Sequence, residues 1–180
     1  RGLLEGLKKL GARVSRIPLD GWGRSVDWKL RPASEDDRDF LYRLHVRTMR
    51  EVIEAIADSR ARVVVAEHNG HMVGFAHVTL SARHELAPSG VQAELLRLYV
   101  QEPFTGVKVG TTLLAEAENL AASAGATVIW LTPWVHNHRA LAFYARRGYG
   151  DFGLTDFTFE GESHENRVLA KPIHATSGAA

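Results

Sequence analysis

One stretch constrains the fold of this chain more than any other, and it reads LYVQEPFTGVKVGTTLLAEAENLAASAG, from Leu98 to Gly125. An apolar strand ends near Val100, a turn with two glycines follows, and a helix then runs to Ala124. Strand, glycine turn and helix N-terminus in this order commonly hold a phosphate group, because the first N–H groups of a helix have no partner within it. The turn TGVKVG, however, contains Lys108 where a third small residue is expected.

Length and composition limit the class of protein. The 180 residues, 45% of them apolar, are enough for one domain with a sizeable core. The net charge of +1 creates no global attraction to nucleic acid or acidic membranes, so neither is an expected partner. Without cysteine the chain has no disulfide, no cysteine–zinc site and no cysteine nucleophile. No apolar run approaches the ~20 residues of a membrane span and no signal-peptide pattern opens the chain, so we expect a soluble, cytoplasmic protein.

Hydrophobic periodicity predicts helices separated by runs of antiparallel strands, which indicates an α+β fold with a mixed sheet. Asn69-Gly70 is a strong hairpin signal, and Gly125 and Gly148 are expected to end helices. We divide the chain into an N-terminal helix–strand extension (1–26) of unknown role, a main domain (27–172) and a disordered tail (173–180). The predicted helices cover 2–10, 34–57, 111–124 and 137–147, and the predicted strands cover 12–17, 27–34, 61–70, 71–82, 93–100, 126–134, 156–161 and 165–173.

A second segment, NHRALAFYARRGY from Asn137 to Tyr149, follows one strand after the glycine turn. The two segments together resemble the GNAT superfamily of acetyl-CoA-dependent N-acetyltransferases, whose later motif commonly reads N-x-x-A-x-x-F-Y-x-x-x-G-F. This motif is matched in register by Asn137, Ala140, Phe143, Tyr144 and Gly148, with Tyr149 in place of the final Phe. The resemblance covers about residues 27–172. It implies a GNAT-type, mostly antiparallel central sheet flanked by helices in a single domain.

The resemblance also implies acetyl-CoA as cosubstrate. The family's pyrophosphate loop, Q/R-x-x-G-x-G/A, falls on residues 105–110, where Gly110 fits and Thr105 and Lys108 depart from the pattern. Lys108 either supplies a positive charge to the phosphates or points to solvent. In the second case it marks a site that is losing its catalytic function. The pantetheine arm is expected along the backbone of Leu98, Tyr99 and Val100. The remaining expected cofactor contacts are Thr105, Gly106, Val107, Lys108, Val109, Gly110, Thr111 and Asn137.

Two residues are expected to move protons during amide formation. An alkylammonium has a pKa of ~10.4, so a base must accept its proton, which is typically worth ~10²–10⁴-fold. Glu94 lies eleven residues before Thr105, at a spacing where some family members carry a glutamate base. Tyr144 occupies the family's usual general-acid position and is expected to protonate the leaving thiolate. Structural roles stay open for both, as a solvated strand-end carboxylate and as an aromatic that packs a helix on the sheet.

The predicted activity is therefore that of an acyltransferase that moves an acetyl group from acetyl-CoA to a primary amine of a small molecule or peptide. One alternative is a non-catalytic GNAT-like module that binds CoA or regulates a partner. Another is a toxin-type enzyme acting on aminoacyl-tRNA, against which the near-neutral net charge argues. The nine histidines show no spacing typical of a metal site, so no metal is expected and surface positions are their default. The acceptor is not specified, and a homodimer is compatible with the family.

Overall fold

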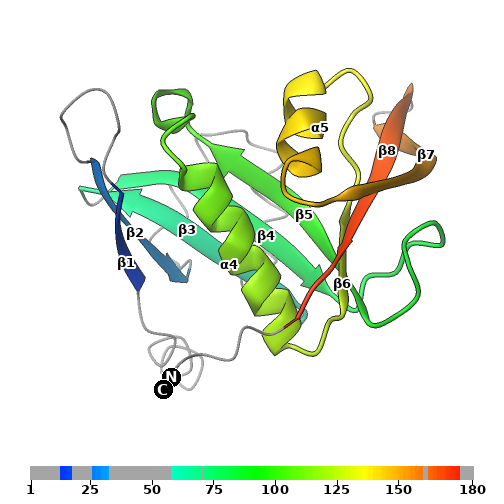
Figure 1. Ribbon diagram of the computed structural model, residues 1–180, viewed down its shortest axis with the longest axis horizontal. Helices are drawn as coiled ribbons and strands as arrows, with labels where there is room; N and C mark the ends of the chain where they lie inside the picture. Colours follow the sequence, from blue (N-terminus) through cyan, green and yellow to red (C-terminus); the bar gives the residue numbers. More distant parts are fainter. Residues whose placement is uncertain (1–12, 18–25, 33–57, 70, 160–161, 175–180) are drawn as a thin grey trace. The chain divides into compact units, whose positions relative to one another are not determined.

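The computed structural model describes residues 13–17, 26–32, 58–69, 71–159 and 162–174 (Figure 1). The helices predicted over 2–10 and 34–57 lie outside these residues, as do 175–180 of the predicted tail. The described elements are β1 (Arg13–Ile17), β2 (Val26–Pro32), β3 (Ala61–His68), β4 (His71–Leu80), β5 (Gln92–Val100), the 3-10 helix η2 (Glu102–Phe104), α4 (Val109–Ser123), β6 (Val128–Leu131), α5 (His138–Ala145), β7 (Gly150–Phe159) and β8 (Glu162–Pro172).

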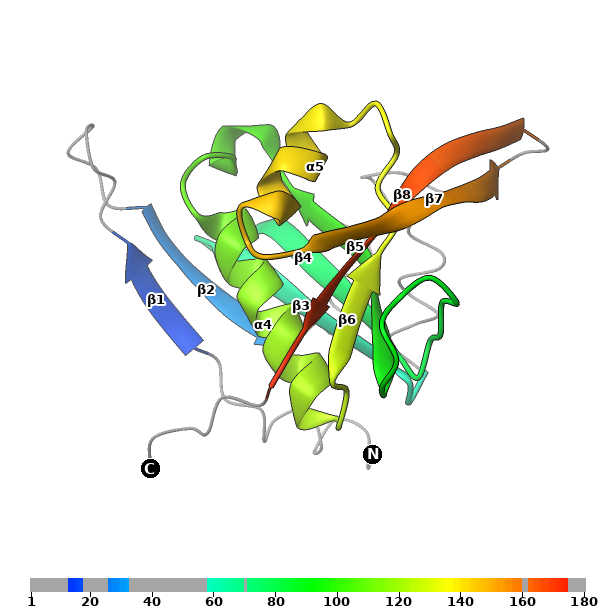
Figure 2. The same ribbon diagram turned by 45° about the vertical axis from the view of Figure 1, so that its right-hand side comes forward.

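All eight described strands belong to one sheet, with the hydrogen-bonded order β1-β2-β3-β4-β5-β6-β8-β7. Strand β5 pairs with β6 in parallel, whereas β1–β2, β2–β3, β6–β8 and β7–β8 pair antiparallel. Figure 2 shows β7 and β8 side by side along their length. The α+β class and the mixed, mostly antiparallel sheet are thus confirmed, and a single sheet agrees with the predicted single domain.

The chain forms two compact units, and each is described by itself. The first consists of residues 1–78 with 97–117, and the second of residues 79–96 with 118–180. In the first unit the core is made by the apolar residues of β3 and β4 and by the beginning of α4. In the second unit the buried side chains come from β5, β6, β8 and the end of α4, together with Tyr144, Tyr149 and Ile173.

In the first unit, Gly74 of β4 allows unusually close packing. A Cβ atom at this position would lie 2.6 Å from the carbonyl oxygen of Tyr99 and 3.1 Å from Cδ1 of Leu113 on α4. Leu113 is fully buried, as are Val109 and Ala117 on the same face of that helix. The missing side chain therefore lets β5 and α4 approach β4 at the strand end where the predicted loop begins.

Gly74→Ala is expected to lower the free energy of unfolding by about 1–3 kcal/mol, because the backbone of β5 must move to make room for the new methyl group. Urea unfolding monitored by circular dichroism measures the change. An unfolding midpoint equal to that of the parent chain would show that β4 and β5 do not pack as closely as the distance to Tyr99 implies.

Both described α-helices end at the predicted glycines. Gly125 and Gly148 have φ of 90° and 84°, in the left-handed region that glycine enters without a steric cost. Several boundaries differ from the predictions, most of all that of β7, which begins at Gly150 instead of residue 156, while β8 begins at Glu162 instead of residue 165. Helix α4 begins at Val109 and so includes Gly110, because Lys108 adopts a left-handed conformation just before it. Ile173, the first residue of the predicted tail, is buried and its N–H donates to the Thr127 carbonyl, so the ordered chain continues past residue 172.

Candidate active site

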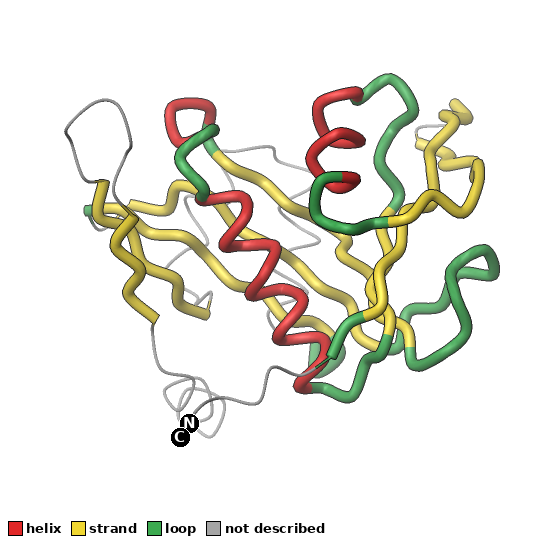
Figure 3. The backbone as a smooth tube through the Cα atoms, in the orientation of Figure 1, coloured by secondary structure: helices red, strands yellow, loops and turns green. Residues whose placement is uncertain are grey.

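The predicted phosphate loop lies in the first unit, between η2 and α4 (Figure 3). Sequence reasoning missed η2, a single turn over Glu102–Phe104. The Thr105 hydroxyl donates to the Glu102 carbonyl at 2.8 Å and so closes this turn. The backbone N–H of Thr105 donates to the same carbonyl at 3.0 Å, so both donors of Thr105 are engaged within the protein and the loop offers a ligand its donors from Gly106 onward.

Lys108 has a backbone conformation that usually belongs to glycine. Its φ is 68°, and that of Gly106 is 84°. A left-handed conformation costs a non-glycine residue about 1–2 kcal/mol. The Lys108 carbonyl accepts the N–H of Thr112 at 3.0 Å, which makes it the first acceptor of α4. The loop has thus lost the middle glycine of the family pattern without losing the backbone shape that glycine provides, and the Lys108 side chain is exposed.

Strand β5 is fastened to β4 where it enters this loop. The N–H of Gln101 donates to the Val73 carbonyl at 2.8 Å, and its side-chain amide donates to the Met72 carbonyl at 2.9 Å. The rings of Tyr99 and Phe75 lie 5.9 Å apart. Leu98, Tyr99 and Val100, predicted to face the pantetheine arm, are therefore held on a fixed strand end. The family motif did not predict that Gln101 holds this end of β5 to β4.

Glu94 lies in the second unit, at the point where β5 and β6 stop pairing. The parallel ladder joins Gln92 to Val128, Ala93 to Ile129 and Glu94 to Trp130. Strand β5 continues to Val100, whereas β6 ends at Leu131. The half-buried Glu94 carboxylate thus belongs to the last paired residue before the strands part.

The face of the sheet that Glu94 occupies can be read from its neighbours. Gln92, two residues earlier and so on the same face, accepts the N–H of His84 at 2.7 Å and donates to the Pro88 carbonyl at 2.9 Å. Trp130, directly opposite Glu94, donates its indole N–H to the Ala82 carbonyl at 3.0 Å. Glu94 therefore shares its face with the loop between β4 and β5.

Tyr144 lies on α5, which covers the other face of this unit. Leu169 of β8 lines a pocket together with α5, and it neighbours Ala170, which is paired with Trp130. Because successive strand residues alternate between faces, α5 and Glu94 approach the sheet from opposite sides. Tyr144 is buried, and burial raises the pKa of its phenol, an effect that the charge of Arg147 partly offsets. The phenol therefore stays protonated at neutral pH.

Asn137 begins α5 in the way the sequence predicts. Its side-chain oxygen accepts the N–H of Ala140 at 3.1 Å, so it is the N-cap. Asn137 belongs to the second unit with Glu94 and Tyr144, whereas residues 98–111 belong to the first. The structure thus gathers the predicted proton-transfer residues in one unit and the predicted phosphate loop in the other.

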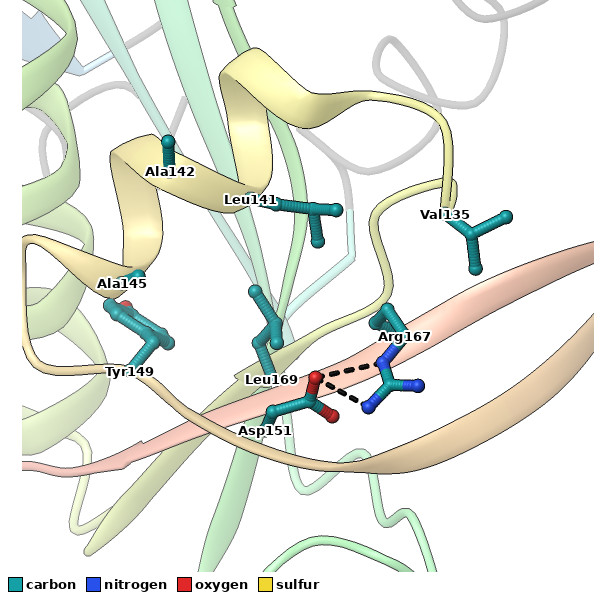
Figure 4. A pocket seen from close by; sticks show the side chains of 8 residues that line it. All are labelled: Val135, Leu141, Ala142, Ala145, Tyr149, Asp151, Arg167 and Leu169. Atoms are coloured by element: carbon teal, nitrogen blue, oxygen red, sulfur yellow. Dashed lines mark hydrogen bonds and ion pairs between the residues drawn. The ribbon is translucent and has the colours of Figure 1, made fainter.

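A pocket of about 520 Å³ opens beside α5 in the second unit (Figure 4). Leu141, Ala142 and Ala145 of α5 form one wall, and the ion pair between Arg167 and Asp151 lies at the opposite side, with Nε 2.8 Å and Nη2 2.6 Å from Oδ2. None of the predicted site residues lines this pocket.

One histidine departs from its expected surface position. His77 on β4 is buried, and its Nδ1 has no hydrogen-bond partner. Burial, together with the nearby charge of Arg97, lowers the pKa of His77 to about 4, so the ring is neutral at neutral pH. Within the described ranges, no three His, Asp or Glu side chains are grouped to hold a metal ion. No helix in the described part of the chain is long and apolar enough to cross a bilayer.

Comparison with known proteins gives a consistent result. The model of the acetyltransferase (GNAT) family matches residues 28–149. An aminoalkylphosphonate N-acetyltransferase of Salmonella typhimurium is 30% identical over 131 residues, which cover 67% of this chain and 84% of that protein. A spermidine N(1)-acetyltransferase of Thermoplasma acidophilum is 36% identical over 88 residues, covering 48% of this chain and 55% of that protein.

A solved structure shares the fold. The PaiA N-acetyltransferase of Thermoplasma acidophilum, in complex with coenzyme A, superposes with a TM-score of 0.57 at 21% identity, covering 81% of this chain and 98% of that one. At this level of identity the likeness concerns the arrangement of helices and strands.

Proposed function

The chain belongs to the acetyltransferase (GNAT) family and is an acetyl-transferring enzyme, and we propose that it moves the acetyl group of acetyl-CoA to a primary amine by direct attack of the amine on the thioester. The amine is carried by a small molecule or a peptide. The named relatives support an amine acceptor, since one is an aminoalkylphosphonate N-acetyltransferase and another a spermidine N(1)-acetyltransferase. The domain responsible is proposed to span residues 27–172.

The loop before α4 suits the pyrophosphate of coenzyme A. The first turn of an α-helix leaves N–H groups without intrahelical partners and carries about half a positive charge. The left-handed backbone of Gly106 and Lys108 turns the chain into this helix end, and Thr111 adds a hydroxyl in the first turn. We propose that the backbone from Gly106 to Thr111 binds the pyrophosphate and that the exposed Lys108 ammonium adds charge. The coenzyme A complex of the structural neighbour supports this choice of cosubstrate.

Glu94 is proposed as the general base. The acceptor arrives as an ammonium ion, and its nitrogen becomes nucleophilic only after losing a proton. The Glu94 carboxylate accepts that proton directly or through one water molecule, and the amine nitrogen then forms a bond to the acetyl carbonyl carbon. The Glu94 carboxylate belongs to the last residue of β5 that pairs with β6.

Tyr144 is proposed as the general acid. As the carbon–sulfur bond breaks, the Tyr144 hydroxyl donates its proton to the sulfur, and CoA leaves as a thiol. Burial raises the pKa of the Tyr144 phenol, so the hydroxyl carries its proton at neutral pH and is a weaker acid than a free tyrosine. Glu94 and Tyr144 belong to opposite faces of the sheet in their unit, so base and acid would act on opposite sides of the reacting carbonyl.

One observation carries the assignment: the β5–β6 ladder ends at Glu94 while β5 runs on to Val100 and into the glycine-type turn. Nothing comparable supports the non-catalytic module. That alternative arose from the loss of glycine at position 108, and the backbone at Lys108 still has the glycine conformation.

Substitutions at Lys108 separate backbone shape from charge. Lys108→Gly and Lys108→Asn both suit a left-handed residue and both remove the ammonium, so each is expected to weaken acetyl-CoA binding about 3- to 10-fold at low salt. Lys108→Gly is also expected to raise the free energy of unfolding by about 0.5–1 kcal/mol, since the relieved left-handed strain is partly offset by the greater freedom of glycine in the unfolded chain. Isothermal titration calorimetry and urea unfolding measure the two effects.

Lys108→Arg, which keeps the charge, serves as the control and should bind acetyl-CoA as the parent does. Unchanged binding in both uncharged variants would mean that Lys108 points to solvent. A complete lack of acetyl-CoA binding by the parent chain at millimolar ligand would contradict the proposed function itself.

A further inference from the structure

A hydrogen-bonded chain of three side chains lies behind α5 in the second unit. The Tyr149 hydroxyl donates to Oε1 of Glu118 at 3.0 Å, and the Lys171 ammonium donates to Oε2 of the same carboxylate at 2.8 Å. Tyr149 is buried, and both charged side chains are mostly covered. These hydrogen bonds join α4, β8 and the turn between α5 and β7, all within one unit.

Tyr149 is also linked to Tyr144 by the backbone hydrogen bonds that terminate α5. The N–H of Tyr149 donates to the Tyr144 carbonyl at 3.2 Å, and the N–H of Gly148 donates to the Ala145 carbonyl at 3.1 Å. These two bonds around a left-handed Gly148 form a Schellman motif, in which the residue after the glycine packs against the residue five positions earlier. The rings of Tyr144 and Tyr149 meet accordingly, with centroids 5.4 Å apart at 64°.

We propose that the Tyr149 hydroxyl, anchored by Glu118 and Lys171, is a positioning group that fixes the orientation of the Tyr144 phenol for proton transfer. The inference rests on the proposed role of Tyr144 as general acid. Tyr149 contacts Tyr144 through its ring and its backbone. The Tyr149 hydroxyl holds the Tyr149 ring against α4 by its hydrogen bond to Glu118.

The anchoring hydroxyl is a feature of this chain rather than of the motif it matches, which commonly has Phe at this position. A Phe ring would complete the Schellman motif equally well, so helix termination does not require the hydroxyl. Burial and the Glu118 carboxylate raise the pKa of Tyr149, which keeps its hydroxyl a permanent donor. Lys171 balances the charge of Glu118, and the Arg147 guanidinium lies near enough to interact with the same carboxylate.

Tyr149→Phe tests the proposal, because it removes the hydroxyl and keeps the ring. We expect kcat to fall about tenfold, equivalent to about 1.4 kcal/mol of activation free energy, with the KM for acetyl-CoA within twofold of the parent value. Glu118→Gln removes the charge of the anchor and is expected to lower kcat in the same direction. It also keeps the proposal testable if Tyr149→Phe folds poorly.

A double-mutant cycle with Tyr144→Phe separates positioning from general stability. If Tyr149 acts through the Tyr144 hydroxyl, then Tyr149→Phe should change kcat by less than twofold once that hydroxyl is gone. An equal tenfold loss in both backgrounds would overturn the proposal, as would an unchanged kcat in Tyr149→Phe beside an impaired Tyr144→Phe. Full activity of Tyr144→Phe itself would overturn the general-acid role and this inference together.

Asp151→Asn provides the matched control. It breaks the ion pair to Arg167 in the pocket that Tyr149 also lines, and it leaves the hydrogen bond between Tyr149 and Glu118 in place. Its kcat should equal that of the parent. A loss of kcat in Tyr149→Phe is then specific to the hydrogen-bonded group of Tyr149, Glu118 and Lys171. A comparable loss in Asp151→Asn would overturn that specificity and, with it, the proposal.

Discussion

Tyr144→Phe is expected to lower kcat about 100-fold, within the range of ~10²–10⁴ that a positioned acid or base contributes. The variant keeps the buried ring and its contacts with Phe143 and Tyr149, whose centroids lie 5.1 and 5.4 Å away, and removes only the proton donor. Acetyl-CoA binding should therefore stay within about twofold of the parent value, since binding does not require the proton. Single-turnover measurements at saturating acetyl-CoA isolate the chemical step from product release.

Phe143→Leu is the control for this variant. Phe143 lies next to Tyr144 on α5, and the Arg147 guanidinium stacks 3.5 Å from its ring centroid. Its replacement should lower the melting temperature and reduce kcat far less than Tyr144→Phe does, because Phe143 supports the Tyr144 ring but has no proton to donate. Equal turnover by Tyr144→Phe and the parent chain would mean that the tyrosine only packs α5 on the sheet.

Glu94→Gln is expected to lower kcat/KM about 10²–10⁴-fold at pH 7, because the ammonium acceptor then lacks a base. The loss should shrink as the pH rises toward the amine pKa of ~10.4, since solvent deprotonates a growing fraction of the acceptor. The pH profile of kcat/KM in the variant should accordingly rise more steeply than that of the parent. A spectrophotometric assay of CoA release between pH 6 and pH 10 measures both curves.

Glu165→Gln provides the comparison for Glu94→Gln. Glu165 is an exposed carboxylate on β8 with no proposed role, and its variant should follow the parent pH profile. If Glu94→Gln kept full activity at pH 7, or if its deficit stayed constant with pH, Glu94 would not be the base.

Much of the fold follows from local sequence signals. Glycine ends both described α-helices at the predicted residues, and Asn137 caps α5 with its side chain as its residue type suggests. Most strands also lie close to their predicted ranges, because apolar runs between turn residues mark them, whereas β7 begins at Gly150, well before its predicted start at residue 156. These features depend on interactions within a few residues, which sequence patterns record directly.

The conformation of Lys108 shows where local reasoning stops. Lysine carries no preference for a left-handed backbone, so only the family pattern, with glycine at this position, gives a hint of its φ of 68°. The burial of His77 is a second case, because histidine in a strand reads equally well as exposed or enclosed. In both cases the surrounding fold overrides the preference of the residue.

Long-range partnerships could not be predicted from the sequence. Glu118 meets Tyr149 across 31 positions and Lys171 across 53, and no spacing rule connects them. The end of the β5–β6 ladder at Glu94 is also a property of two separate strands rather than of either alone. In the sequence, the hydrogen-bonded group of Tyr149, Glu118 and Lys171 is indicated only by Tyr149, which stands where the motif commonly has Phe.

The most direct test of the account is whether the chain releases CoA from acetyl-CoA in the presence of a primary amine. A thiol-reactive chromophore reports the release without background from the protein, which contains no cysteine. The amine panel should include an aminoalkylphosphonate, spermidine and a peptide with a free N-terminus, with each product identified by mass spectrometry. We predict CoA release that depends on at least one amine, yields the acetylated amine and is strongly reduced in Glu94→Gln. Bound acetyl-CoA that stays intact with every amine would contradict the account and identify the chain as a CoA-binding module.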